Sequence, residues 1–458
     1  MGHRSRNALS AKPDWTNVTP KDAPDFVRIN TIEASPTTAG KAYVSGIRYL
    51  VDNDRHPYIW KTTDYGQTWT RIDGGIPADD FVRAVREDPT RAGLLYAASE
   101  TTVYISWDDG AHWKPLSMNL PNTQVSDLVV EAHDLVIGTH GRAFWVMRNI
   151  DLLRQMSPQV ADSKSWLFDP KDPVQEFDRT ADFFYYLKDD AQKVNVQVMD
   201  AAGNVVGSFD SAEGDEKPVE NQGGGRFGAG GVQKPSKKKG SNRFRWNMRT
   251  EGWTDFDGRI FWAAGNVGPS VLPGHYQVRL TVDGQSKTQD FEVKMNPRAA
   301  KEGVTVADLK ARHDLAAKIR DRVTDANDAV IRMRAIKAQV DDRLSKSDNG
   351  ELQSLGGTVK SRLSGVESEI YQVKNQSNQD PLNYPIMLNN KIAALLNLVE
   401  GSYHRPTDQS YTVFDELSQK LGTETDQMNL VISQDLAQLN QLLRKLGLDP
   451  IDVDKLIS

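Results

Sequence analysis

The most informative stretch of the chain is Thr62-Thr63-Asp64-Tyr65-Gly66-Gln67-Thr68-Trp69. It returns, degraded at one position, as Ser106-Trp107-Asp108-Asp109-Gly110-Ala111-His112-Trp113. Each copy follows an alternating apolar run. An Asp carboxylate can accept hydrogen bonds from turn amides, and a Gly supplies a backbone position with φ > 0. We therefore interpret four residues of each copy as the ones that hold a hairpin turn: Thr62, Asp64, Gly66 and Trp69, and Ser106, Asp108, Gly110 and Trp113.

Both stretches belong to a longer internal repeat. The equivalent segments are Phe26–Pro36 with Phe81–Pro89, and Lys41–Ser45 with Leu95–Ser99. A third copy runs from Val125 to Met147 and lacks the Asp/Gly turn. Four short strands in every ~40–50 residues is the period of a β-propeller blade. Residues 1–150 are therefore predicted to form a partial β-propeller of about three blades.

The predicted blades are too few for a closed propeller, which needs about four to eight. Trp15-Thr16-Asn17-Val18 reads as the last strand of a preceding blade. An open array of blades exposes the faces of its end blades, which is a pairing hazard. We therefore expect the chain to be the C-terminal portion of a longer protein, with the upstream propeller blades as its partners.

At this point the residues resemble a known family. Pro57–Trp69, Ser106–Gly110, Asn119–Pro121 and Gly138–Trp145 resemble the large bacterial exported proteins with sortilin-like, BNR/Asp-box β-propellers. Members are often labelled glycosyl hydrolases because sialidases share the repeat. The resemblance implies a propeller of many blades and a periplasmic or extracellular location for the full-length protein. It implies no established reaction.

Residues 160–297 are predicted to form an Ig-like β-sandwich. Alternating runs at 182–187 and 193–199 read as strands, and Asp283-Gly284 is a two-residue hairpin turn. Short strands with such turns are typical of this fold, and Leu272–Leu280 resembles the module that follows the propeller in the same family. Residues 211–241 are predicted to be a disordered Gly/Lys-rich insertion.

Residues 300–458 are predicted to form an antiparallel helical bundle. Apolar residues recur from Leu309 to Val340 with two positions per heptad. Further helices are expected at Glu351–Val373, Pro385–Glu400 and Asp408–Leu446, the last ending before Gly447 and Pro450. Such a bundle serves either as a folding and packing module or as a partner-binding, dimerising surface.

Composition narrows the function classes. The 458 residues are 38% hydrophobic and 26% charged, as in ordinary globular proteins. A net charge of −6 argues against nucleic acid as a partner. The chain has no cysteine, which excludes disulfides and thiolate chemistry. No apolar run reaches the ~18 residues of a transmembrane segment, and Met1–Asn7 is not followed by the apolar segment of a signal peptide.

Catalytic patterns are not found in the sequence. The eight histidines have no metal-ligand spacing, and there is no G-x-S-x-G nucleophile elbow. No metal, cofactor or catalytic residue is therefore predicted. Arg83, His140 and Arg142 are the candidate ligand-binding residues, because each lies near the inner strands of a blade. The alternative role for Arg142 is a structural one, in an ion pair or as a clamp on backbone carbonyls. Asp64 and Asp108 resemble a pair of acid/base carboxylates, but we interpret them as residues that hold their turns.

Two functions follow from this reading. The first is a non-catalytic recognition protein that binds a peptide, a protein or a glycan. The second is a sialidase-like glycosyl hydrolase with its catalytic blades upstream of Met1, since such an enzyme takes its arginines, Tyr nucleophile and acid/base carboxylate from several blades. We favour the first, and expect no turnover from this chain.

Overall fold

The computed structural model describes residues 16–176, 180–211 and 234–453. Trp15 and most of the predicted insertion, residues 212–233, lie outside the described residues. The chain divides into two compact units between Asp162 and Ser163. Residues 16–18, predicted as the end of a strand, carry no regular structure.

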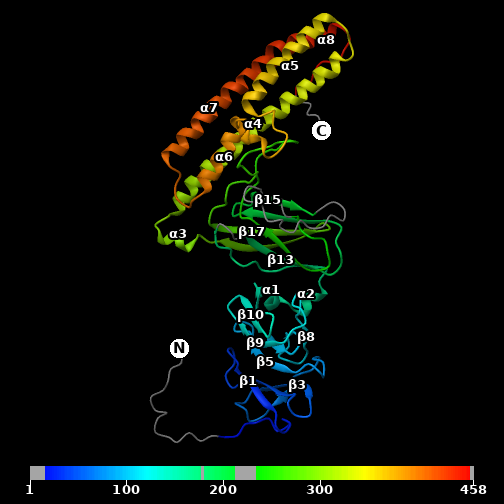
Figure 1. Ribbon diagram of the computed structural model, residues 1–458, viewed down its shortest axis with the longest axis vertical. Helices are drawn as coiled ribbons and strands as arrows, with labels where there is room; N and C mark the ends of the chain where they lie inside the picture. The colour runs from blue at the N-terminus through cyan, green and yellow to red at the C-terminus, as the bar shows by residue number, and fades with distance from the viewer. Residues whose placement is uncertain (1–15, 177–179, 212–233, 454–458) are drawn as a thin grey trace. The chain divides into compact units, whose positions relative to one another are not determined.

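The first unit contains three antiparallel sheets in chain order (Figure 1, blue to cyan). The first sheet is β1(Arg28–Ala34), β2(Ala42–Arg48), β3(Asp54–Thr62) and β4(Thr70–Arg71). The second is β5(Val82–Glu87), β6(Leu95–Ser99), β7(Val103–Ser106) and β8(Lys114–Pro115). The third has three strands, β9(Val125–Val130), β10(Asp134–Thr139) and β11(Phe144–Arg148), and is followed by α1(Asp151–Gln155) and α2(Pro158–Asp162).

The second sheet is covered on both faces. Every residue of β6, Leu-Tyr-Ala-Ala-Ser, is buried, because alternate side chains enter two different cores. Leu95 and Ala97 belong to the core shared with the first sheet, which includes Tyr43 and Ile59. The core shared with the third sheet contains Tyr96, Ala98, Ile105, Leu128 and Ile137. The second sheet is thus held between the first and the third.

The third sheet is covered on one face only. Val129, Phe144 and Val146 are 47%, 81% and 51% exposed. Val136 pairs with both valines across the sheet, so the four side chains form one apolar surface, named here the open face. The repeat makes Val103 and Ile105 the counterparts of Phe144 and Val146, and both are buried under the third sheet.

The second unit begins with two antiparallel sheets that share one core. Their strands are β12(Ser165–Leu167), β13(Ala181–Leu187) and β16(Gly240–Trp246) in one, and β15(Val205–Asp210), β14(Val194–Asp200), β17(Gly274–Val282) and β18(Gln285–Val293) in the other. Phe183, Phe244 and Trp246 from the first sheet pack against Val198 and Phe291 from the second. The strict alternation of buried residues in β13 is what a sheet with one covered face requires.

Helices make up the rest of the second unit. They are α3(Pro297–Lys301), α4(Val306–Leu344), α5(Gly350–Ile370), η2(Asp380–Leu382), α6(Leu388–Glu400) and α7(Asp408–Val431), which continues through the π-helical turn η3(Ile432–Leu436) into α8(Ala437–Lys445). Thr305 and Asp308 form a capping box at the start of α4. The heptad positions predicted in α4 are buried against its neighbours: Leu309, Ala316, Ile319, Val323, Ala326, Val330, Met333 and Val340.

The structure confirms antiparallel sheets followed by a C-terminal helical region (Figure 1), but the described chain is mixed β and α and not mainly β, because the long helices α4, α5 and α7 contribute so many residues. Among the described helices, none is both long enough and apolar enough to cross a bilayer.

The open face makes a test possible between two equivalent positions. We expect Val146→Lys to leave the unfolding free energy of the first unit within about 0.5 kcal/mol, because Val146 is half exposed. Its counterpart Ile105 is 1% exposed, so Ile105→Lys buries a charge and should cost about 3 kcal/mol or more. Denaturant unfolding followed by tryptophan fluorescence measures both. Equal losses would show that Val146 is covered in solution.

Candidate functional site

The two repeated turns, at Thr62–Trp69 and Ser106–Trp113 and named here the boxes, have the same hydrogen bonds. Thr62 Oγ1 donates to Asp64 Oδ1 at 2.8 Å, and Ser106 Oγ donates to Asp108 Oδ1 at 2.8 Å. The amides of Thr68 and His112 each donate to the same carboxylate oxygen at 2.9 Å. Gly66 and Gly110 have φ of 86° and 88°, and their amides donate back to the hydroxyls. Both carboxylates are occupied inside their own turns.

The two tryptophans of the boxes fasten each turn to the preceding segment. Trp69 Nε1 donates to the carbonyl of Val18, and Trp113 Nε1 donates to the carbonyl of Ile72, both at 2.6 Å. The difference lies in burial. Trp113 is 3% exposed and belongs to the core between the first two sheets, whereas Trp69 is only partly buried.

The second turn differs from the first at the residue after Asp108, which is Asp109 where the first turn has Tyr65. Asp109, with φ of 61°, sends its carboxylate between the first two sheets. There it contacts Lys41 Nζ at 2.7 Å and Lys61 Nζ at 2.9 Å, and accepts from Tyr43 Oη at 2.6 Å. Burial acts to raise the pKa of Asp109, but these partners outweigh it and hold the pKa below its ordinary value.

Glu87 completes this buried cluster. One of its oxygens accepts from Lys41, Tyr43 and the amide of Gly93. Burial, followed by the bond to Asp109, raises the pKa of the Tyr43 hydroxyl, which therefore stays protonated as a donor. The charges of the cluster are balanced and its groups pair with one another between the sheets, so the arrangement stabilises sheet packing.

The three predicted ligand-binding residues lie in two places. Arg83 is bound to Glu100 through two nitrogens, at 3.1 and 2.7 Å, and its guanidinium lies over Phe81 at 4.9 Å. His140 and Arg142 lie in the exposed β10–β11 turn. The amide of Arg142 donates to Thr139 Oγ1 and its carbonyl accepts from Trp145 Nε1. Its side chain is exposed, not buried in an ion pair or carbonyl clamp.

A groove beside the second repeated turn, Ser106–Trp113, was not predicted from the sequence. This Trp107 groove has a volume of about 490 Å³, within the range of small-ligand pockets. Its walls come from the box, from β8 and from the α1–α2 segment. The lining residues are Arg91, Trp107, Asp108, His112, Lys114, Met156, Ser157, Pro158 and Ala161.

The hydrogen bonds around the groove fix its walls. Trp107 Nε1 donates to the carbonyl of Leu153 at 2.8 Å, which sets the orientation of the indole ring. Arg91 Nη1 donates to three carbonyls of the segment that follows α1's first turn: Leu153, Arg154 and Met156, at 3.1, 2.6 and 2.8 Å. Burial lowers the pKa of Arg91. The opposite wall of the groove is thereby held in place against the ring.

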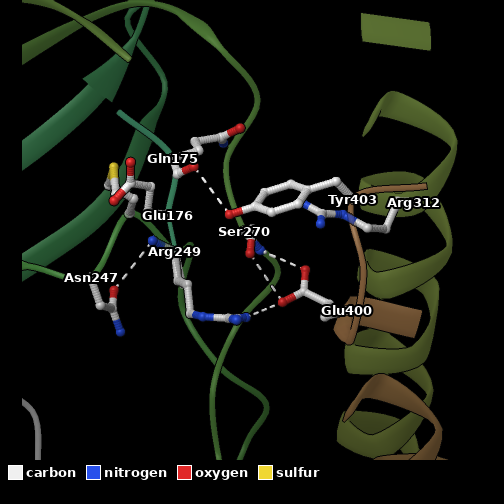
Figure 2. Close-up of a pocket in the computed structure, with 9 residues that line it drawn as sticks. Gln175, Glu176, Asn247, Arg249, Ser270, Arg312, Glu400 and Tyr403 are labelled. Atoms are coloured by element: carbon white, nitrogen blue, oxygen red, sulfur yellow. Dashed lines mark hydrogen bonds and ion pairs between the residues drawn. The ribbon is translucent and has the colours of Figure 1, made fainter. Parts of the chain in front are cut away.

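A second cavity lies inside the second unit, where the sheets meet the helices (Figure 2). It is small, about 70 Å³. Glu400 of α6 pairs with Arg249 and accepts from the amide and hydroxyl of Ser270 at 2.9 and 3.1 Å. Arg312 of α4 is 4% exposed, donates to the carbonyl of Ser402 and lies over the ring of Tyr403. The cavity is large enough only for water, and its charged side chains are paired with one another or with the backbone, which fits a structural role.

A third hollow lies along the Asp52–His56 loop of the first unit. Asp54 there binds Arg48, His56 and Tyr58, at 3.1, 2.8 and 2.7 Å. These bonds, against the effect of burial, lower the pKa of Asp54. Across the described parts of the chain, no group of three or more His, Asp or Glu side chains is arranged to hold a metal ion.

Comparisons with known proteins identify no family. No protein-family description matches the chain, and no curated protein matches it. Among solved structures, CopC from Methylosinus trichosporium OB3b aligns at 12% identity over 29% of this chain and 95% of that chain, with a TM-score of 0.16. An ancestral GH74 enzyme aligns at 12% identity over 55% of this chain and 41% of that chain, with a TM-score of 0.19. TM-scores this low carry no argument about fold or function.

The carboxyl group of Asp64 makes the stability of the first unit depend on pH. Hydrogen bonds, first of all from the Thr68 hydroxyl at 2.6 Å, lower the pKa of Asp64 to about 2. A carboxyl with a depressed pKa stabilises the fold above its unfolded pKa, and this contribution is lost as pH falls toward the folded pKa. We expect Thr68→Val to lower the melting temperature at pH 6, with the deficit shrinking between about pH 4 and pH 2.

Thr63→Val is the matched control, because Thr63 is exposed in the same turn. Its effect on thermal unfolding should be small and independent of pH. A constant deficit for Thr68→Val across the whole range would contradict the assigned role of that hydroxyl.

The Glu400 contacts predict how the second unit is stabilised. Glu400→Gln keeps the size of the side chain but removes the charge opposite Arg249, and should cost the second unit about 2 kcal/mol. Glu416→Gln, at an exposed position of α7, should stay within about 0.5 kcal/mol. Calorimetry of the two variants measures the difference. Equal stability would mean that the pair does not hold sheet and helix together.

Proposed function

We propose that the chain is a non-catalytic recognition protein that binds a peptide, a protein or a glycan. One observation carries the proposal. The Trp107 groove joins an apolar floor to a few polar groups and has the volume of a ligand pocket. Its walls are fixed by hydrogen bonds from Trp107 and Arg91. A pre-formed pocket lowers the cost of ordering that binding otherwise carries.

The first unit, in this proposal, is part of a sortilin-like Asp-box β-propeller. Two turns with the same hydrogen bonds and the sequential stacking of the sheets support it. The open face supports the expected partner, further blades of the same repeat, because its counterpart in the second sheet is buried by the third. A periplasmic or extracellular location follows from the resemblance and belongs to the same proposal.

The two sheets of the second unit are proposed to be an Ig-like module. Support comes from their antiparallel strands, their common aromatic core and the hairpin at Asp283-Gly284. In this proposal the ligand binds to the first unit, and the Ig-like module and the helices have a supporting role.

The sialidase-like alternative needs free arginines around one substrate carboxylate. Three arginines of the first unit are engaged elsewhere, Arg83 with Glu100, Arg86 with Asp127 and Arg154 with Asp88, whereas Arg142 is exposed. The three ion pairs support binding over hydrolysis for this chain.

The test is a binding screen of the full chain against oligosaccharide and peptide arrays. Ala161→Trp should fill the groove at an exposed position of α2 and weaken the selected ligand at least tenfold. Arg142→Ala, at the exposed β10–β11 turn, should leave affinity unchanged.

Three outcomes would overturn the proposal. The first is that no ligand is found. The second is the reverse ranking of the two variants, which would place the site at the predicted arginine. The third is turnover of sialosides or aryl glycosides that Arg142→Ala abolishes, which would favour the hydrolase.

A further inference from the structure

We propose that the Trp107 groove takes an aromatic side chain of a peptide segment that also carries acidic residues, with the ring against Trp107 and a carboxylate near Lys114. This inference rests on the proposed function and names the ligand class of the same site.

The Asp-box turn does not require the tryptophan at position 107. The corresponding position in the first box is Thr63, which is exposed, and the two turns have the same hydrogen bonds. Trp107 instead packs partly against the core of the second and third sheets and donates its N–H to Leu153. The rest of the ring lines the groove.

Apolar groups stand around this ring. Met156 and Pro158 line the groove together with Ala161, and Arg91 holds the carbonyl of Met156. A flat apolar group between such walls buries both of its faces, and aromatic pairs gain about 0.5–1.5 kcal/mol beyond burial.

The charges around the groove favour an anionic ligand. The carboxylate of Asp108 is occupied by Ser106 and by His112, whose Nδ1 lies 2.7 Å away. Lys114 is exposed on β8, and within the described residues it has no ion pair. Arg91 is bonded to carbonyls and also interacts electrostatically with the carboxylate of Asp88. Lys114 is therefore the positive charge that an anionic ligand would meet at the groove.

The experiment compares three peptides by calorimetry on the full chain: acetyl-Asp-Phe-Asp-amide, acetyl-Lys-Phe-Lys-amide and acetyl-Asp-Ala-Asp-amide. The acidic aromatic peptide should bind at least fivefold more tightly than either other peptide. Lys114→Glu should abolish the preference for acidic over basic flanks. Lys21→Glu, at an exposed position elsewhere in the first unit, should preserve it.

Pro158→Asp serves as a second groove variant, since Pro158 is exposed and its replacement leaves the core intact. It should weaken the acidic aromatic peptide at least threefold. Equal binding of the acidic and basic peptides, or binding of a polygalacturonate oligomer that Ala161→Trp blocks, would overturn this inference while leaving the recognition function standing. Failure of every peptide and saccharide to bind would overturn both.

Discussion

The first unit depends on the ionic contacts of one carboxylate between two sheets. Asp109 meets Lys41 and Lys61 of the first sheet, while its own backbone belongs to a turn of the second. Its amide donates to the carbonyl of Gly93, as the amide of Tyr65 does to Gly40 in the first box. The turn therefore sets the direction of the carboxylate, and the carboxylate sets the separation of the sheets. The partly buried charge of Asp109 is tolerated here because two lysines of the first sheet pair with it.

Close packing on both faces follows from that spacing. Ala97 of β6 leaves room for large neighbours such as Tyr43 and Trp113 on one side. The same strand offers Tyr96 to the third sheet. Polar contacts thus fix the register of the stack, and apolar contacts provide most of its stabilisation. The groove beside Trp107 lies at the rim of this rigid arrangement, which is why its walls need only a few hydrogen bonds to stay in place.

The sequence allowed the coarse architecture to be predicted, because repeats, turn residues and heptads are local patterns. Asp64 and Asp108 could be recognised in this way. The neighbouring Asp109 could not, since nothing in the motif distinguishes it from the exposed Tyr65. Arg83 lies in β5, and its pairing with Glu100 is a tertiary contact that the sequence pattern does not show. The groove joins Trp107 to the carbonyl of Leu153, a long-range contact with no periodic signal.

The open face of the third sheet has a consequence for how such chains evolve. Each sheet contacts only the sheet next to it in the chain, through apolar cores and, between the first two sheets, through the contacts of Asp109, and none of these contacts depends on how many sheets precede or follow. The number of sheets is therefore not encoded in any single one of them. Gene duplication or deletion of a whole repeat can change that number without redesigning a core, and selection acts afterwards on how the ends are covered.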